Sequence, residues 1–182
     1  MVQISRLIAF LSVASLGLAL VVQRDATQVE GDLTKISAQV TTLDNAILAF
    51  PETGGTLTQA LFVHNDAIIL DTDIKTATTD ATASGPFGAA SDAILDQVQN
   101  LEPLIDKTLN DLIAKKAAFA ALSVGGITAL VLADLETLQK DTELLASALE
   151  NKISANDLAA LKAATATIDG YFNQAIAVYK TN

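Results

Sequence analysis

Residues 29–68 read VEGDLTKISAQVTTLDNAILAFPETGGTLTQALFVHNDAI, and this stretch decides the fold. Its first half spaces apolar residues at alternating steps of four and three: Val29, Leu33, Ile36, Val40, Leu43, Ile47 and Phe50. Residues three and four apart share one face of a helix, so the pattern predicts an amphipathic helix over residues 26–49. Pro51 and the pair Gly54-Gly55 end this helix, because proline cannot continue it and glycine permits a sharp reversal.

A second helix is predicted to follow at once, over residues 56–79 or slightly beyond. Its apolar face is assigned to Leu57, Leu61, His64 and Ile68, which are again three and four residues apart. The two helices form an antiparallel hairpin, because the connection between them is short. The apolar face of such a hairpin has to be covered, so further helices must pack on it.

A third helical segment is predicted to begin near residues 89–91, after a loop at residues 83–86. Pro103 interrupts its pattern, because proline removes a backbone donor and crowds the preceding turn. The segment, which reaches residue 121, is therefore either one kinked helix or two. Its inward residues are predicted to be Ile94, Leu95, Val98, Leu101, Ile105, Leu109, Leu112 and Phe119.

Two more helices are predicted after a hinge at Gly125-Gly126. The first of them has its apolar stripe at Val131, Leu135, Leu138, Leu145 and Leu149. The segment Ser154-Ala155-Asn156-Asp157 resembles a capping box at the start of the last helix. The stripe of that helix is Leu158, Leu161, Ile168, Phe172, Ile176 and Tyr179. Because short loops make neighbouring helices antiparallel, the sequence predicts an all-α, up-and-down bundle of five or six amphipathic helices.

The composition indicates one domain and excludes several functions. The chain has 182 residues, of which 51% are hydrophobic, and this is enough for one substantial core. The formal net charge of −10 argues against binding to nucleic-acid phosphates, which requires clustered lysine and arginine. Because the chain has no cysteine, thiol chemistry and zinc–thiolate sites are excluded, and packing alone must hold the fold.

The N-terminus has the pattern of a secretory signal peptide. Arg6 precedes an apolar run from Leu7 to Val22, and Gly17-x-Ala19 offers small residues for cleavage. A transmembrane anchor is the alternative, but the run is shorter than the roughly 20 residues that span a bilayer. We predict a signal peptide at residues 1–19, a further cut near residue 24, and one helical domain over residues 25–182. The polar C-terminus carries no signal for a GPI anchor, so the protein is expected to be extracellular, with any cell-wall association non-covalent.

Four motifs give the chain a resemblance to a known family. They are Leu43-Asp44-x-x-Ile47, Phe50-Pro51-x-x-Gly54-Gly55, Ala60-Leu61-x-x-His64 and Leu112-x-x-Lys115-Lys116-x-x-Phe119. With them the chain resembles the fungal hydrophobic surface-binding protein A family, related to the cell-wall galactomannoproteins, over essentially its whole length after the leader. The resemblance implies a helical bundle that takes fatty acids between its helices, or one that adsorbs to hydrophobic surfaces and helps to recruit secreted hydrolases.

The candidate binding residues are those expected to line an elongated apolar cavity between the helices. His64, Thr108, Lys116, Thr142 and Thr165 place polar groups in otherwise apolar stripes, and a few polar groups in an apolar cavity are typical of a lipid site. Each also has a structural interpretation: a core histidine paired with a carbonyl or carboxylate, threonines bonded to the backbone one turn earlier, and a lysine that reaches water. The predicted cavity-lining set is Val40, Leu43, Ile47, Leu61, His64, Ile68, Ile105, Leu109, Leu112, Lys116, Leu138, Thr142, Leu145, Leu161, Thr165, Ile168 and Phe172.

No catalytic motif accompanies these residues. Neither a Gly-x-Ser-x-Gly nucleophile motif nor a phosphate-binding glycine loop occurs, and the acidic residues are scattered, so no enzymatic activity, metal or other cofactor is predicted. We expect a secreted, non-enzymatic protein that binds a fatty acid or similar lipid in a cavity between helices. The alternative is a surface-active or cell-wall structural protein that adsorbs to hydrophobic surfaces and recruits secreted hydrolases.

Overall fold

The computed structural model describes residues 25–181, which form five long helices and one short 3-10 helix. The elements are α1 (Ala26–Ala49), α2 (Leu57–Ala83), η1 (Gly88–Ala90), α3 (Ser91–Ala120), α4 (Ile127–Glu150) and α5 (Leu158–Lys180). The expected all-α, up-and-down bundle is confirmed, with five helices. The predicted signal peptide and its cleavage sites lie outside the described residues.

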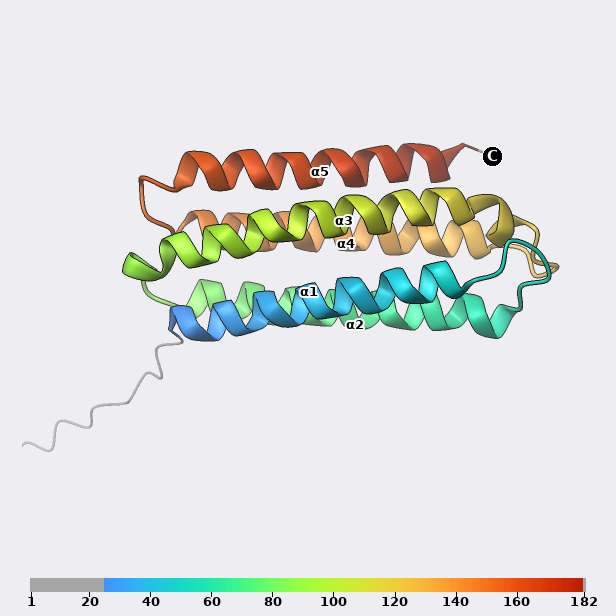
Figure 1. The fold of residues 1–182 in the computed structure, drawn as a ribbon, viewed down its shortest axis with the longest axis horizontal. Coiled ribbons are helices and arrows are strands. Elements are labelled where there is room, and N and C mark those ends of the chain that lie inside the picture. Colours follow the sequence, from blue (N-terminus) through green and yellow to red (C-terminus); the bar gives the residue numbers. More distant parts are fainter. Residues whose placement is uncertain (1–24, 182) are drawn as a thin grey trace, which may run out of the picture.

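The helices form three layers in an elongated bundle (Figure 1). The hairpin of α1 and α2 makes the first layer, and α3 and α4 make the second. The third layer is α5, which packs on both α3 and α4. α3 packs between α1 and α5, and α4 packs between α2 and α5, whereas α3 and α4 have few direct contacts with each other. The middle of the bundle is therefore enclosed by side chains from every helix.

Pro103 lies inside α3, so residues 91–120 form one helix and not two. The proline is exposed, and so is Gln99, whose backbone carbonyl is the one that Pro103 cannot bond. Because this part of the helix faces water, solvent can satisfy that carbonyl. The helix continues through the proline for this reason.

The capping box of this bundle lies at the start of α2 and not, as predicted, at the start of the last helix. Thr56 and Gln59 form a capping box at the start of α2, where each side chain bonds the backbone of the other residue. The capping box predicted at residues 154–157 is wrong. There Ser154 Oγ donates to the Asp157 carboxylate at 2.7 Å, and the Ser154 amide donates to Ser91 Oγ at 3.0 Å. The first bond lies within the turn before α5, and the second ties this turn to the start of α3.

The predicted apolar face of α2 is also wrong. Leu61 and Ile68 are 44% and 48% exposed, and the helix buries a different set: Ala60, Val63, Ala67, Leu70, Ile74, Ala77 and Ala81. Large apolar residues occur on several sides of this helix, as in the run 61–63 and the run 68–70, so their spacing does not select one face. The alanines select it, because small side chains let α2 pack closely against its neighbours.

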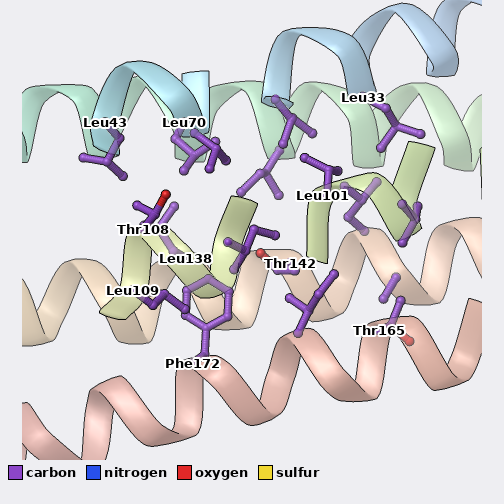
Figure 2. Close-up of a pocket in the computed structure, with 18 of the residues that line it drawn as sticks. Leu33, Leu43, Leu70, Leu101, Thr108, Leu109, Leu138, Thr142, Thr165 and Phe172 are labelled. Carbon is purple, nitrogen blue, oxygen red and sulfur yellow. The ribbon is translucent and has the colours of Figure 1, made fainter. Parts of the chain in front are cut away.

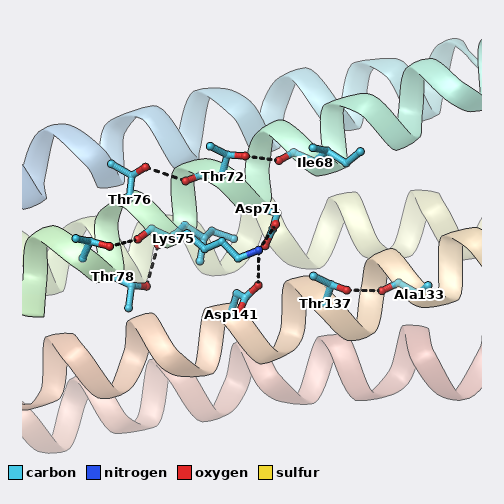
Figure 3. Close-up of polar contacts among 11 residues, drawn as sticks. Ile68, Asp71, Thr72, Lys75, Thr76, Thr78, Ala133, Thr137 and Asp141 are labelled. Carbon is cyan, nitrogen blue, oxygen red and sulfur yellow. Dashed lines mark hydrogen bonds and ion pairs between the residues drawn. The ribbon is translucent and has the colours of Figure 1, made fainter.

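Two polar links connect α2 to α4. Lys75 Nζ lies 2.6 Å from Asp71 Oδ2 on its own helix and 3.3 Å from Asp141 Oδ2 on α4 (Figure 3). Further along, His64 Nδ1 lies 2.8 Å from Asp134 Oδ2 on α4. The apolar interface between α2 and α4 thus has polar contacts at its edge. None of the helices within residues 25–181 combines the length and the apolar character that a membrane span requires.

Candidate functional site

A narrow cavity of about 70 Å³ lies in the middle of the bundle, and all five long helices line it (Figure 2). It lies where α3 and α4 have few direct contacts. Its lining is aliphatic apart from one phenylalanine and three threonines. The residues are Leu33, Ile36, Val40, Leu43, Leu70, Ile74, Val98, Leu101, Ile105, Thr108, Leu109, Leu138, Thr142, Leu145, Ala146, Leu149, Thr165, Ile168 and Phe172.

The three threonines supply all the polar side-chain atoms of this lining, and they differ in their partners. Thr108 Oγ1 donates to the Leu104 carbonyl at 2.8 Å, and Thr165 Oγ1 donates to the Lys162 carbonyl at 3.2 Å. These two follow the structural interpretation, in which the hydroxyl bonds its own helix. The Thr142 hydroxyl makes no hydrogen bond within the part of the chain that the structure describes. It is therefore available to a polar group of a ligand.

Most of the predicted site residues lie around this cavity. The structure brings together ten of them: Val40, Leu43, Ile105, Leu109, Leu138, Thr142, Leu145, Thr165, Ile168 and Phe172. Sequence reasoning missed Leu70 and Ile74, because the apolar face of α2 was assigned wrongly. It also left out five residues that the predicted apolar stripes contain but that were not assigned to the cavity: Leu33, Ile36, Val98, Leu101 and Leu149.

A smaller cavity of about 40 Å³ adjoins the first one towards the α1–α2 turn. The two share Leu43, Thr108, Leu109 and Leu138, and the smaller one is lined by three further predicted residues: Ile47, His64 and Leu112. His64 is only partly buried, and its partner is the Asp134 carboxylate, as in its structural interpretation. Burial raises the pKa of Asp134, and the hydrogen bond with His64 acts in the opposite direction.

Four predicted residues do not line either cavity. Leu61 and Ile68 face outward on α2, and Leu161 is fully buried but is packed against other side chains. Lys116 reaches the end of α5, where Nζ donates to the carbonyls of Val178, at 2.8 Å, and Thr181. An ammonium suits these carbonyls, because the C-terminal end of a helix carries partial negative charge. Placing Lys116 at the cavity was therefore wrong.

Within residues 25–181, no cluster of three or more histidine, aspartate or glutamate side chains could hold a metal ion. What the site offers chemically is an apolar space with one unpartnered hydroxyl.

The fold and cavity define an up-and-down helical bundle with an apolar interior between its layers. The family model for hydrophobic surface binding protein A matches residues 26–151, and the chain belongs to this family. The resemblance seen in the sequence motifs is thus confirmed. A search of curated protein sequences gives no match.

Solved structures with the same fold agree with this assignment. The structure of AFMP4P in complex with palmitic acid is 33% identical with a TM-score of 0.80, and the match covers 86% of this chain and 100% of that one. Ligand binding domain 1 of the Penicillium marneffei MP1 protein, complexed with arachidonic acids, is 22% identical with a TM-score of 0.76 over 85% and 99% of the two chains. Domain 2 of that protein, complexed with multiple arachidonic acids, is 17% identical with a TM-score of 0.77 over 88% and 99%. At these lower identities the two domains show the fold alone.

Proposed function

We propose that this protein binds a fatty acid or a similar long-chain lipid in the cavity between its helices. The observation that carries the proposal is the aliphatic lining to which all five long helices contribute. Burial of an acyl chain contributes about 0.8 kcal/mol per methylene, so a long chain can be held with few polar contacts. The 33% identical structure with palmitic acid supports the same ligand class.

The cavity must widen to accept such a ligand. Its volume is about 70 Å³, whereas an engineered cavity that binds benzene is about 150 Å³. A long acyl chain is much larger than benzene, so the helices must move apart when it binds. The sparse contact between α3 and α4 favours this widening there, because few packed side chains have to separate.

The proposal is tested by native mass spectrometry of the protein incubated with palmitic acid. We expect a one-to-one complex for the unchanged protein and a strongly reduced fraction of complex for Val98→Phe, which fills the cavity. Val124→Phe, at a residue that is 48% exposed outside the helices, is the matched control and should bind normally. A mass that stays that of the free protein at every lipid concentration would refute the proposal.

Adsorption to hydrophobic surfaces is the second candidate function. We define the α2 apolar surface by five residues that are 38% to 63% exposed: Leu57, Leu61, Phe62, Ile68 and Ile69. Large apolar side chains exposed together on one helix are typical of interaction sites. The family is described by hydrophobic surface binding, which supports this candidate. In this function the protein is a surface-active or cell-wall structural protein that recruits secreted hydrolases.

Both functions suit a secreted protein that is not an enzyme. The signal-peptide pattern of residues 1–19 supports secretion. The aliphatic lining of the cavity, with hydroxyls as its only polar side-chain groups, supports binding over catalysis. Secretion is tested by sequencing the N-terminus of the protein recovered from culture medium, which should begin near residue 20 or residue 25. A chain that stays inside the cell with its first residues intact would refute it.

A further inference from the structure

A larger surface groove of about 350 Å³ lies between α4 and α5. It shares four lining residues with the central cavity: Thr142 and Ala146 on α4, and Thr165 and Phe172 on α5. One face of each of these residues is turned to the cavity and another to the groove. The central cavity is thus separated from this groove by a single layer of side chains, three of which are small.

Two polar links between α4 and α5 border this thin part of the bundle. At one end Gln139 Nε2 donates to Asp169 Oδ1 at 2.5 Å. At the other end Lys162 Nζ lies 3.8 Å from Glu150 Oε2, which is a loose ion pair. Between them, no hydrogen bond or ion pair that the structure describes joins the two helices. The helices can separate here without losing a polar contact.

The charged groups of the groove disfavour an anion. α4 contributes Glu143 and Glu150, and α5 contributes Asp169 and Lys162, so three carboxylates face one ammonium. That ammonium is already close to Glu150, and Asp169 accepts hydrogen bonds from two amide side chains. An ionised ligand carboxylate would meet net repulsion here. An uncharged hydroxyl or a protonated carboxyl would not, and each can form a hydrogen bond with the unpartnered Thr142 hydroxyl.

We propose that the lipid enters the cavity between α4 and α5, in the part of this seam that lies between the Gln139–Asp169 contact and the Glu150–Lys162 contact. Its headgroup stays in the groove, and the groove accepts an uncharged headgroup in preference to a carboxylate. This inference rests on the proposed lipid binding and adds the route and the headgroup class. Long-chain alcohols are therefore better ligands than the ionised acids of equal chain length. Fatty acids bind best where their carboxyl is protonated.

The headgroup preference is tested with hexadecanol and palmitic acid, each titrated into the protein at about pH 7.5 and about pH 5. At the higher pH the alcohol should bind roughly tenfold more tightly, since two or three nearby carboxylates repel the ionised acid. The difference should shrink at the lower pH, where carboxyl groups begin to take up protons. Equal binding, or tighter binding of the acid at the higher pH, would overturn the preference. If neither lipid binds, the proposed function itself fails.

The groove charges are tested with the double substitution Glu143→Gln and Glu150→Gln. Palmitic acid should then bind roughly three- to tenfold more tightly at about pH 7.5, because the repulsion falls, while binding of hexadecanol stays the same. The matched control is Glu30→Gln with Glu102→Gln, which changes the net charge equally on α1 and α3. An equal gain in the control would show that overall charge acts, and would overturn the role of the groove.

The route is tested by the rates of binding of Ala166→Phe. Ala166 is exposed and lines the groove but not the central cavity, so a larger side chain should obstruct the seam without disturbing the core. We expect slower association and slower dissociation of hexadecanol in stopped-flow measurements. Ala133→Phe, at an exposed alanine on α4 outside the groove, is the control. Unchanged rates in Ala166→Phe, with normal binding, would place the route elsewhere and overturn it.

Discussion

Lys115 Nζ lies 2.6 Å from the backbone carbonyl oxygen of Phe50, so a buried ammonium on α3 holds the residue that ends α1. The same nitrogen lies 2.6 Å from Glu52 Oε1. Nearby, the ring of Phe50 stacks on that of Phe119 with 4.3 Å between the ring centroids. The turn between α1 and α2 is therefore fixed on α3 by one charged and one aromatic contact.

Replacing Lys115 by methionine should destabilise the fold by about 2–3 kcal/mol. The substitution keeps the apolar stem but leaves the Phe50 carbonyl without its donor, and an unsatisfied buried group is costly. The free energy of unfolding is measured by urea titration. Lys140→Met is the control, because that side chain is exposed and forms no hydrogen bond or ion pair with the residues that the structure describes, so it should change the stability by less than about 0.5 kcal/mol. Equal effects of the two substitutions would contradict the buried role of Lys115.

Gly55→Ala should also loosen this turn. A methyl group at residue 55 would lie 2.5 Å from Cζ of the Phe50 ring, so the ring would have to move from its stack on Phe119. We expect a loss of about 1–3 kcal/mol, which is typical of overpacking. Gly31→Ala on α1 is the matched control, since nothing lies within 4 Å of its added methyl group. It should stabilise the helix by about 0.5–1 kcal/mol, and thermal unfolding would reveal the opposite signs.

The sequence predicted four of the five helices with their correct apolar faces. In α1, α3, α4 and α5 the large aliphatic residues occur mainly on one side, so their spacing identifies the buried face. α2 does not follow this rule, because Leu61 and Ile68 are exposed and Ala60 and Ala67 are buried. Spacing of large residues cannot identify a face whose packing depends on small ones.

The site could be predicted only in part, because a stripe does not distinguish a packed residue from one beside a void. Leu161 is fully buried against its neighbours, whereas Leu145 on α4 lines the cavity. The same holds for Lys115 and Lys116, which lie three and four residues after Leu112 on the same helix. Lys115 is buried, and only its tertiary packing distinguishes it from Lys116. The cavity lies where α3 and α4 have few direct contacts, and no single helix encodes how its neighbours pack.

Asp134→Asn should change how stability depends on pH. Burial raises the pKa of Asp134 in the folded protein above its ordinary value, so the folded state gains stability as the pH falls through that raised value. The asparagine variant lacks this gain, yet its side chain can still form a hydrogen bond with His64. We expect the variant to be more stable relative to the original protein near neutral pH than in acid. Urea titrations of both proteins between about pH 4 and pH 7.5 measure the difference, and a constant difference would be contrary to the raised pKa.

Leu61→Gln combined with Ile68→Gln should weaken adsorption to hydrophobic surfaces while leaving the cavity unchanged. The two side chains are 44% and 48% exposed and belong to the α2 apolar surface. Half-burial of one such side chain against an apolar surface contributes roughly 1 kcal/mol, so losing two should weaken the affinity for hydrophobic beads roughly thirtyfold. The control is Leu144→Gln with Val124→Gln, which removes two equally exposed apolar side chains outside that surface. Retention that falls equally in both variants would mean that adsorption follows total exposed apolar area. If only the α2 pair reduces retention, and palmitic acid still binds normally, then the α2 apolar surface carries adsorption and the cavity carries lipid binding.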